Sequence, residues 1–98
     1  MNPDASWHGD YKSSNWIYVG GLDYRLTEGD VLTVFAQWGE MQEIRLARDE
    51  ETGRSKGFAF ICYCNQLSTV LAVDNFNGIS LLGRTLKVDH LAKSRIPQ

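Results

Sequence analysis

KGFAFICY, residues 56–63, carries the strongest structural signal in the chain. Aromatic and β-branched residues dominate this run, and such residues favour strands. Neighbouring side chains of a strand point to opposite faces of the sheet. Phe58 and Phe60 therefore share one face, and Ala59 and Ile61 share the other. The run predicts a strand with one aromatic face and one face that belongs to a core.

Three other runs predict three more strands. Residues 16–19 (WIYV) end at a Gly-Gly turn, and in this run Trp16 and Tyr18 share the outward face. Residues 41–48 (MQEIRLAR) and 85–89 (TLKVD) alternate in the same way. The side chains expected to face the core are Ile17, Val19, Ile44, Leu46, Leu86 and Val88.

Two helices are predicted between these strands. The first opens near Thr27, the candidate N-cap, and Asp30 three residues later gives a weaker version of the capping box. It ends at Gly39, and the second helix spans about residues 66–76 before an Asn-Gly pair. The buried stripes are expected at Val31, Val34, Phe35 and Trp38, and at Thr69, Ala72, Val73 and Phe76.

The resulting order is β-α-β-β-α-β, the ferredoxin-like arrangement of the α+β class. Both helices must then cover one face of a four-stranded antiparallel sheet, and the other face stays bare. With 98 residues, the chain has room for one small domain. We expect an N-terminal arm over residues 1–14, the domain over residues 15–91, and a truncated C-terminal extension over residues 92–98.

Composition excludes several classes of function. The formal net charge of −2 argues against duplex binding mainly through phosphates. No apolar run is long enough to span a membrane. Cys62 and Cys64 are too close in sequence to staple the domain, so we expect two reduced thiols that serve as small packing residues. Zinc-ligand spacing, a nucleophile elbow and a phosphate-binding loop are lacking, so we expect no metal, no cofactor and no enzyme activity.

The bare face of the predicted sheet displays Tyr18, Phe58 and Phe60. An apolar face of this kind is costly to leave in water and calls for a partner. The sequence leaves two explanations for these exposed rings. The rings are covered by an arm of the chain or a second subunit, or they bind a ligand.

Residues 56–63 fit the eight-residue ribonucleoprotein motif, with Ile61 in place of Val. Residues 17–22 (IYVGGL) resemble its six-residue companion, with Gly21 where Asn is common. On these motifs the chain resembles the RNA-recognition motif family over about residues 15–90. The resemblance implies an RNA-binding module that is a monomer on its own.

The resemblance also implies a role for each side chain on the bare face. Tyr18 and Phe58 would each stack beneath a base, and Phe60 would pack against the sugars between them. Lys56 would contact a phosphate. The further candidate RNA contacts are Arg54, Arg45, Arg48, Lys87 and Trp16.

Several aromatic and polar residues around this face keep two interpretations each. Trp7, Tyr11 and Trp16 pin the N-terminal arm across the sheet, or they extend the RNA surface. Asp89 and His90 hydrogen-bond base edges, or they are solvated polar residues at the end of the last strand.

Four other stretches resemble one subfamily, the RNA-recognition subunit of the retention and splicing complex. They are residues 7–16 (WHGDYKSSNW), 26–30 (LTEGD), 68–78 (STVLAVDNFNG) and 88–90 (VDH). This resemblance implies a nuclear protein that acts in pre-mRNA splicing and binds peptide segments of other subunits of that complex. The chain departs from the expected pattern at Cys64, Asn65 and Leu67, and it ends before the long charged tail common in these proteins.

Extra apolar residues on the helices suggest where such peptides bind. Leu32, Val70 and Leu71 remain after the core stripes are assigned, and they either pack at the margin of the core or line a groove for an aromatic anchor. Glu28 and Asp30 would lie near that groove and favour basic peptides. The alternative function is a protein-only adaptor whose sheet does not bind RNA.

Overall fold

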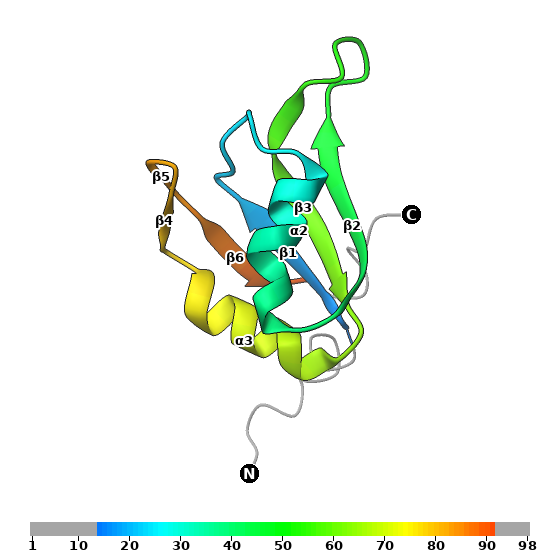
Figure 1. Ribbon diagram of the computed structural model, residues 1–98, viewed down its shortest axis with the longest axis vertical. Helices are drawn as coiled ribbons and strands as arrows, with labels where there is room; N and C mark the ends of the chain where they lie inside the picture. The colour runs from blue at the N-terminus through cyan, green and yellow to red at the C-terminus, as the bar shows by residue number, and fades with distance from the viewer. Residues whose placement is uncertain (1–13, 92–98) are drawn as a thin grey trace.

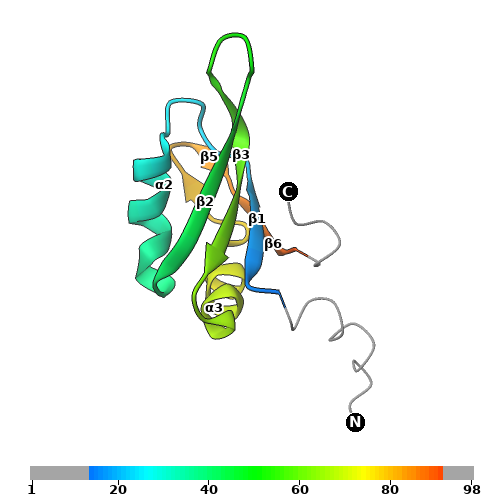
Figure 2. The ribbon, with the colours of Figure 1, turned by 90° about the vertical axis from the view of Figure 1, so that its right-hand side faces the viewer.

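The computed structural model describes residues 14–91 and shows two helices packed on one face of a four-stranded antiparallel sheet (Figures 1 and 2). The strand order is β2-β3-β1-β6, so β2 and β6 are the edges. The strands are β1 (Trp16–Gly20), β2 (Met41–Arg48), β3 (Ser55–Tyr63) and β6 (Lys87–His90). The helices are α2 (Glu28–Phe35) and α3 (Gln66–Phe76). The predicted fold class is confirmed.

The start of α2 has the predicted cap. The Asp30 backbone N–H donates to Thr27 Oγ1 over 3.3 Å, and the Thr27 backbone N–H donates to Asp30 Oδ2 over 3.0 Å. This reciprocal pair satisfies two backbone donors that a helix end leaves open. The helix then tightens into a 3-10 turn, η1 (Ala36–Trp38), and stops at Gly39.

The core lies between the helices and the inner face of the sheet. Ile17, Val19 and Ile61 are fully buried there. Phe35 of α2 meets Phe76 of α3 edge to face, with 5.1 Å between ring centroids. The predicted alternation of β1 and β3 is thus confirmed, and it leaves the outer face without a helix (Figure 2).

The end of the domain differs from the prediction. Instead of one strand over residues 85–89, a short hairpin of β4 (Ser80–Leu81) and β5 (Arg84–Thr85) precedes β6. The Leu86 backbone N–H donates to Ile79 O over 2.8 Å, so the chain there belongs to the hairpin side and not to the main sheet. Leu82 and Gly83 both have positive φ, 54° and 81°, as a tight two-residue hairpin turn requires. Leu is an unusual residue for that turn, so the sequence did not signal the hairpin.

The two cysteines have different environments. Cys62 lies in β3 opposite Trp16 and is 7% exposed. Cys64 follows the strand and is exposed, so the prediction that both thiols are packing residues is wrong for Cys64. The chain turns from β3 toward α3 at this residue, which carries its side chain out of the sheet. Burial raises the pKa of the Cys62 thiol.

Within residues 14–91, no helix is both long and apolar enough to cross a membrane. The same residues contain no group of three or more His, Cys, Asp or Glu side chains that could hold a metal ion. The described part of the chain leaves out residues 1–13 of the arm predicted over residues 1–14, with Trp7 and Tyr11, and the whole extension predicted over residues 92–98.

Candidate nucleic-acid interface

Three aromatic rings form a contiguous cluster on the outer face of the sheet, which we call the ring platform: Tyr18, Phe58 and Phe60. The centroid of the Tyr18 ring lies 6.1 Å from that of Phe58 and 5.9 Å from that of Phe60, and 5.9 Å separates the two Phe rings. All three side chains are partly exposed, in contrast to the fully buried Ile17 and Ile61 of the same strands. The platform therefore offers partly exposed apolar ring surface on the outer face of the sheet.

Strand register brings the three rings together. Tyr18 of β1 lies directly opposite Phe60 of β3, and Gly20 lies opposite Phe58. The Tyr18 ring leans over Gly20, where a Cβ atom would lie 2.5 Å from Tyr18 Oη. Gly20 thus gives Tyr18 the room to approach Phe58. We did not single out Gly20 from the sequence, although a glycine inside a strand is a known signal of close approach.

Trp16 and Arg45 lie next to the ring platform on the outer face of the sheet, toward the Cys62 end of β3. The Arg45 guanidinium carbon lies 5.6 Å from the centroid of the Trp16 ring, a cation–π contact that crosses β3 near Cys62. Glu43 also contacts Arg45 Nε. Both predicted residues therefore lie on the ring face, and Trp16 with Arg45 over it extends the apolar surface by one more aromatic side chain.

The predicted phosphate contacts divide into two groups. Lys56 and Arg54 are exposed and form no ion pair within the described residues, whereas Lys87 Nζ lies 3.6 Å from Asp89 Oδ2. Arg48 is turned away toward α2, where its Nη2 lies 2.6 Å from Glu28 Oε1. Among these predicted contacts, the cations without a carboxylate partner thus lie at the start of β3 or just before it, near Phe58.

The loop between β2 and β3 stabilises the charged form of one carboxylate, Asp49. Backbone N–H groups of Thr52 and Glu51 donate to Asp49 and, with the charge of Lys56 nearby, hold the pKa of Asp49 below its ordinary value. This loop projects from one end of the sheet (Figure 2). A phosphate approaching Lys56 therefore meets negative charge on one side, which weakens non-specific binding of polyanions.

The sequence analysis did not single out Tyr24, which is 60% exposed. It lies in the turn after β1, with the Arg84 guanidinium carbon 5.1 Å from its ring centroid. A Cβ atom at Gly57 would lie 2.9 Å from the Tyr24 ring, so Tyr24 packs on the backbone of β3 outside the ring platform.

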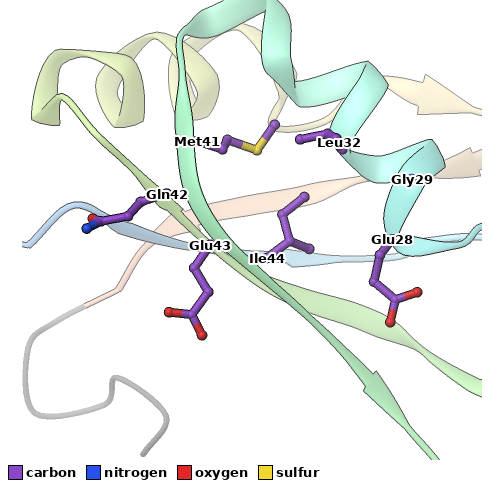
Figure 3. Close-up of a pocket in the computed structure, with 7 residues that line it drawn as sticks. All are labelled: Glu28, Gly29, Leu32, Met41, Gln42, Glu43 and Ile44. Atoms are coloured by element: carbon purple, nitrogen blue, oxygen red, sulfur yellow. The ribbon is translucent and has the colours of Figure 1, made fainter.

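A second surface lies between α2 and β2, and we call it the α2–β2 pocket. Glu28 and Leu32 line it, whereas Asp30, Val70 and Leu71 do not. Asp30 is engaged in the helix cap. The remaining lining residues are Gly29, Met41, Gln42, Glu43 and Ile44 (Figure 3). Of the five predicted peptide-binding residues, this pocket thus brings together Glu28 and Leu32, and it adds residues of β2 that were not among those predicted.

Comparison with known proteins places the domain in a family. The RNA recognition motif family matches residues 17–87. The chain is 62% identical to the rat "RNA-binding motif protein, X-linked 2" over 94 residues, which is 96% of this chain and 29% of that protein. It is 52% identical to the Saccharomyces cerevisiae "U2 snRNP component IST3" over 92% of this chain and 61% of that protein. The chain thus spans less than two thirds of these relatives.

Solved structures with a similar fold belong to the same kinds of protein as these relatives. A structure described as a Snu17p-Pml1p intermediate during RES complex assembly has a TM-score of 0.74 and is 50% identical, covering 87% of this chain and 71% of that chain. The Rna15 RRM with bound GU RNA has a TM-score of 0.77 and is 36% identical, covering 85% and 88%. The resemblance to the retention and splicing subunit, stated from sequence motifs, is confirmed. The chain belongs to the RNA recognition motif family.

Proposed function

We propose that this domain binds single-stranded RNA on the ring platform and acts in pre-mRNA splicing as part of a retention and splicing complex. The observation that carries the proposal is the contact among Tyr18, Phe58 and Phe60 on an outer face without a helix. Unpaired bases stack on such rings, and RNA recognition motifs use their sheets in this way. The names of the relatives support the splicing role and a nuclear location.

Each ring has a proposed role. Tyr18 and Phe58 are tilted by only 34° relative to each other, which suits two bases stacked side by side. Phe60 stands at 84° to Phe58 and packs against the sugars between them. Lys56 and Arg54 neutralise phosphates, while Arg45 and Lys87 exchange their present carboxylate partners for phosphates.

The affinity follows from these contacts. Stacking contributes roughly 1–3 kcal/mol per base, and two or three bases give a gross gain of a few kcal/mol. A micromolar complex needs about 8 kcal/mol. With few accessible cations to add to this gain, we expect the isolated domain to bind RNA weakly, in the micromolar range or above. The family gives no reason to expect catalysis, and the site supplies a binding surface only.

A protein-only adaptor is the second candidate function. The net charge of −2 and the carboxylates paired with Arg45 and Lys87 favour it, because both lower the attraction for RNA. In the splicing proposal, peptide segments of other subunits bind on the helical side, through Leu32 with Glu28 and Asp30 or through Val70 and Leu71. These side chains are partly or largely exposed.

A titration of the ¹⁵N-labelled domain with a GU-repeat RNA octamer separates the two functions. RNA binding predicts shift changes in β1 and β3 around Tyr18 and Phe58. The adaptor predicts no response to RNA but a response on the helices to partner peptides. Absence of any RNA response at millimolar concentration would remove the RNA proposal.

A further inference from the structure

We propose that the α2–β2 pocket is a docking site for a short extended peptide that carries one large apolar side chain beside Lys or Arg residues. The inference rests on the peptide-binding part of the proposed function and assigns it to one surface. That surface combines an apolar pocket, an open strand edge and two carboxylates.

The pocket has the size and the lining for one side chain. It is an open pocket of about 270 Å³, less than the roughly 300–1,000 Å³ of most small-molecule sites. Leu32 and Met41 point toward each other across the gap between α2 and β2, and Ile44 points toward the same gap from β2 (Figure 3). Leu32 is 46% exposed, although Met41 and Ile44 are packed against the core. An apolar side chain of a ligand placed there would cover Leu32 and pack against Met41 and Ile44, which themselves contact the core.

Local backbone features open this pocket. Gly29 lines it from α2, and because Gly29 has no side chain, a ligand reaches the helix backbone. The register of β2 against β3 shifts between Met41 and Glu43. Such a bulge bends a strand and re-aims its side chains, and here it lies at the residues that form the pocket wall.

β2 also offers backbone hydrogen bonds to a peptide. It is an edge of the four-stranded sheet, so one side of the strand has no neighbouring strand in that sheet. Between its two register shifts, Glu43–Leu46 pair regularly with β3. An extended peptide can add to such an edge, with main-chain bonds giving affinity and a side-chain pocket giving specificity. The α2–β2 pocket lies beside this segment.

Charge determines which peptide fits. Glu28 and Glu43 both line the pocket, and their side chains are 46% and 42% exposed. Each contacts an arginine of the same chain, Arg48 and Arg45 respectively, but exposed ion pairs of this kind are weak. A Lys or Arg of the peptide can therefore share either carboxylate, whereas an acidic peptide is repelled.

The α3 surface provides a matched comparison. Leu71 is 38% exposed and Val70 39%, close to the exposure of Leu32, but neither lines the pocket. Leu32→Gln and Leu71→Gln each replace one exposed leucine of a helix by a residue of similar helix propensity. The two variants thus differ in the surface that they alter.

The test uses the ¹⁵N-labelled chain and a blocked peptide of sequence Gly-Lys-Arg-Trp-Lys-Gly as the probe. We expect shift changes at Gly29, Leu32 and Ile44, and about tenfold or more weaker binding in Leu32→Gln, a loss typical of a central anchor. Leu71→Gln should bind as the unmodified chain does. Peptides with Ala for Trp, or with Glu for Lys and Arg, should bind at least about tenfold more weakly.

Three results would overturn the inference. They are weaker binding in Leu71→Gln but not in Leu32→Gln, shift changes confined to the ring platform, and equal binding of the acidic peptide. Titration of Leu32→Gln with the GU-repeat RNA measures RNA binding separately from peptide binding. Unchanged RNA binding with lost peptide binding supports the inference, whereas an absent RNA response in the unmodified chain removes the RNA proposal and leaves the peptide result standing.

Discussion

Replacing Tyr18 by alanine is the sharpest test of the ring platform. Tyr18 is the platform ring that comes from β1, and its centroid lies 6.1 Å from that of Phe58 and 5.9 Å from that of Phe60. Loss of one stacked base costs roughly 1–3 kcal/mol. At about 1.4 kcal/mol per factor of ten, Tyr18→Ala should weaken RNA binding by about 5-fold to 150-fold.

The same substitution has a calculable effect on folding. Two aromatic contacts of about 0.5–1.5 kcal/mol each are lost, so the free energy of unfolding should fall by about 1–3 kcal/mol. A domain stable by about 5–15 kcal/mol stays folded after such a loss. Affinity can therefore be measured on a folded variant, once its thermal melting curve shows a cooperative transition well above the assay temperature.

The assay is fluorescence anisotropy with a labelled GU-repeat RNA octamer. Tyr18→Phe keeps the ring and should bind within about twofold of the unmodified chain. Tyr24→Ala is a matched control, because it removes an aromatic ring that is 60% exposed and lies outside the platform. If Tyr18→Ala binds RNA as well as Tyr18→Phe does, stacking on this face does not hold the RNA, and the reasoning fails.

Four other outcomes are expected. Gly83→Ala should lower the free energy of unfolding in urea by about 1–2 kcal/mol, because Gly83 has a positive φ. Gly21→Ala should lower it further, because Gly21 also has a positive φ and its added Cβ would lie 2.2 Å from a backbone oxygen. Tyr63→Phe should lose about 1–3 kcal/mol in the same assay, because the Tyr63 hydroxyl donates to a buried backbone carbonyl over 2.7 Å; an unchanged midpoint would contradict this. Arg48 lowers the pKa of Glu28 by hydrogen bonding, so this carboxylate adds stability above its ordinary pKa of 4.5 that is lost as the pH falls below that value; Glu28→Gln should flatten the acid limb of a stability–pH curve. RNA affinity should fall with salt along a log–log slope of about −3 or shallower, since about 0.7 applies per phosphate contact and Lys56, Arg54, Arg45 and Lys87 are the proposed contacts; a slope steeper than about −4 would contradict the charge distribution.

Local signals predicted much of this domain correctly. The Thr27–Asp30 capping box needed only residues three apart in sequence, and the structure has it. The bounds of α3 were also predicted, from the apolar stripe and the Asn-Gly pair that ends it. Signals of this kind depend on backbone geometry that neighbouring residues share, so a single sequence reveals them.

Other features were not predicted from the sequence. The β4–β5 hairpin turns at Leu82, whose positive φ a leucine rarely adopts, and the exposure of Cys64 depends on where the chain leaves β3. Gly20 makes room for the Tyr18 ring through a contact that depends on side-chain tilt. For these features, the surrounding fold overrides the preference of the individual residue.

The two candidate surfaces show the same division. Side chains alternate across a strand with a period of two, so the sequence alone placed Tyr18, Phe58 and Phe60 on one outer face. The α2–β2 pocket instead needs a helix and an edge strand to lie side by side, with a bulge between Met41 and Glu43 that re-aims the wall. That arrangement is set by packing among residues distant in sequence, which no local periodicity encodes. Only the tertiary structure therefore reveals the pocket.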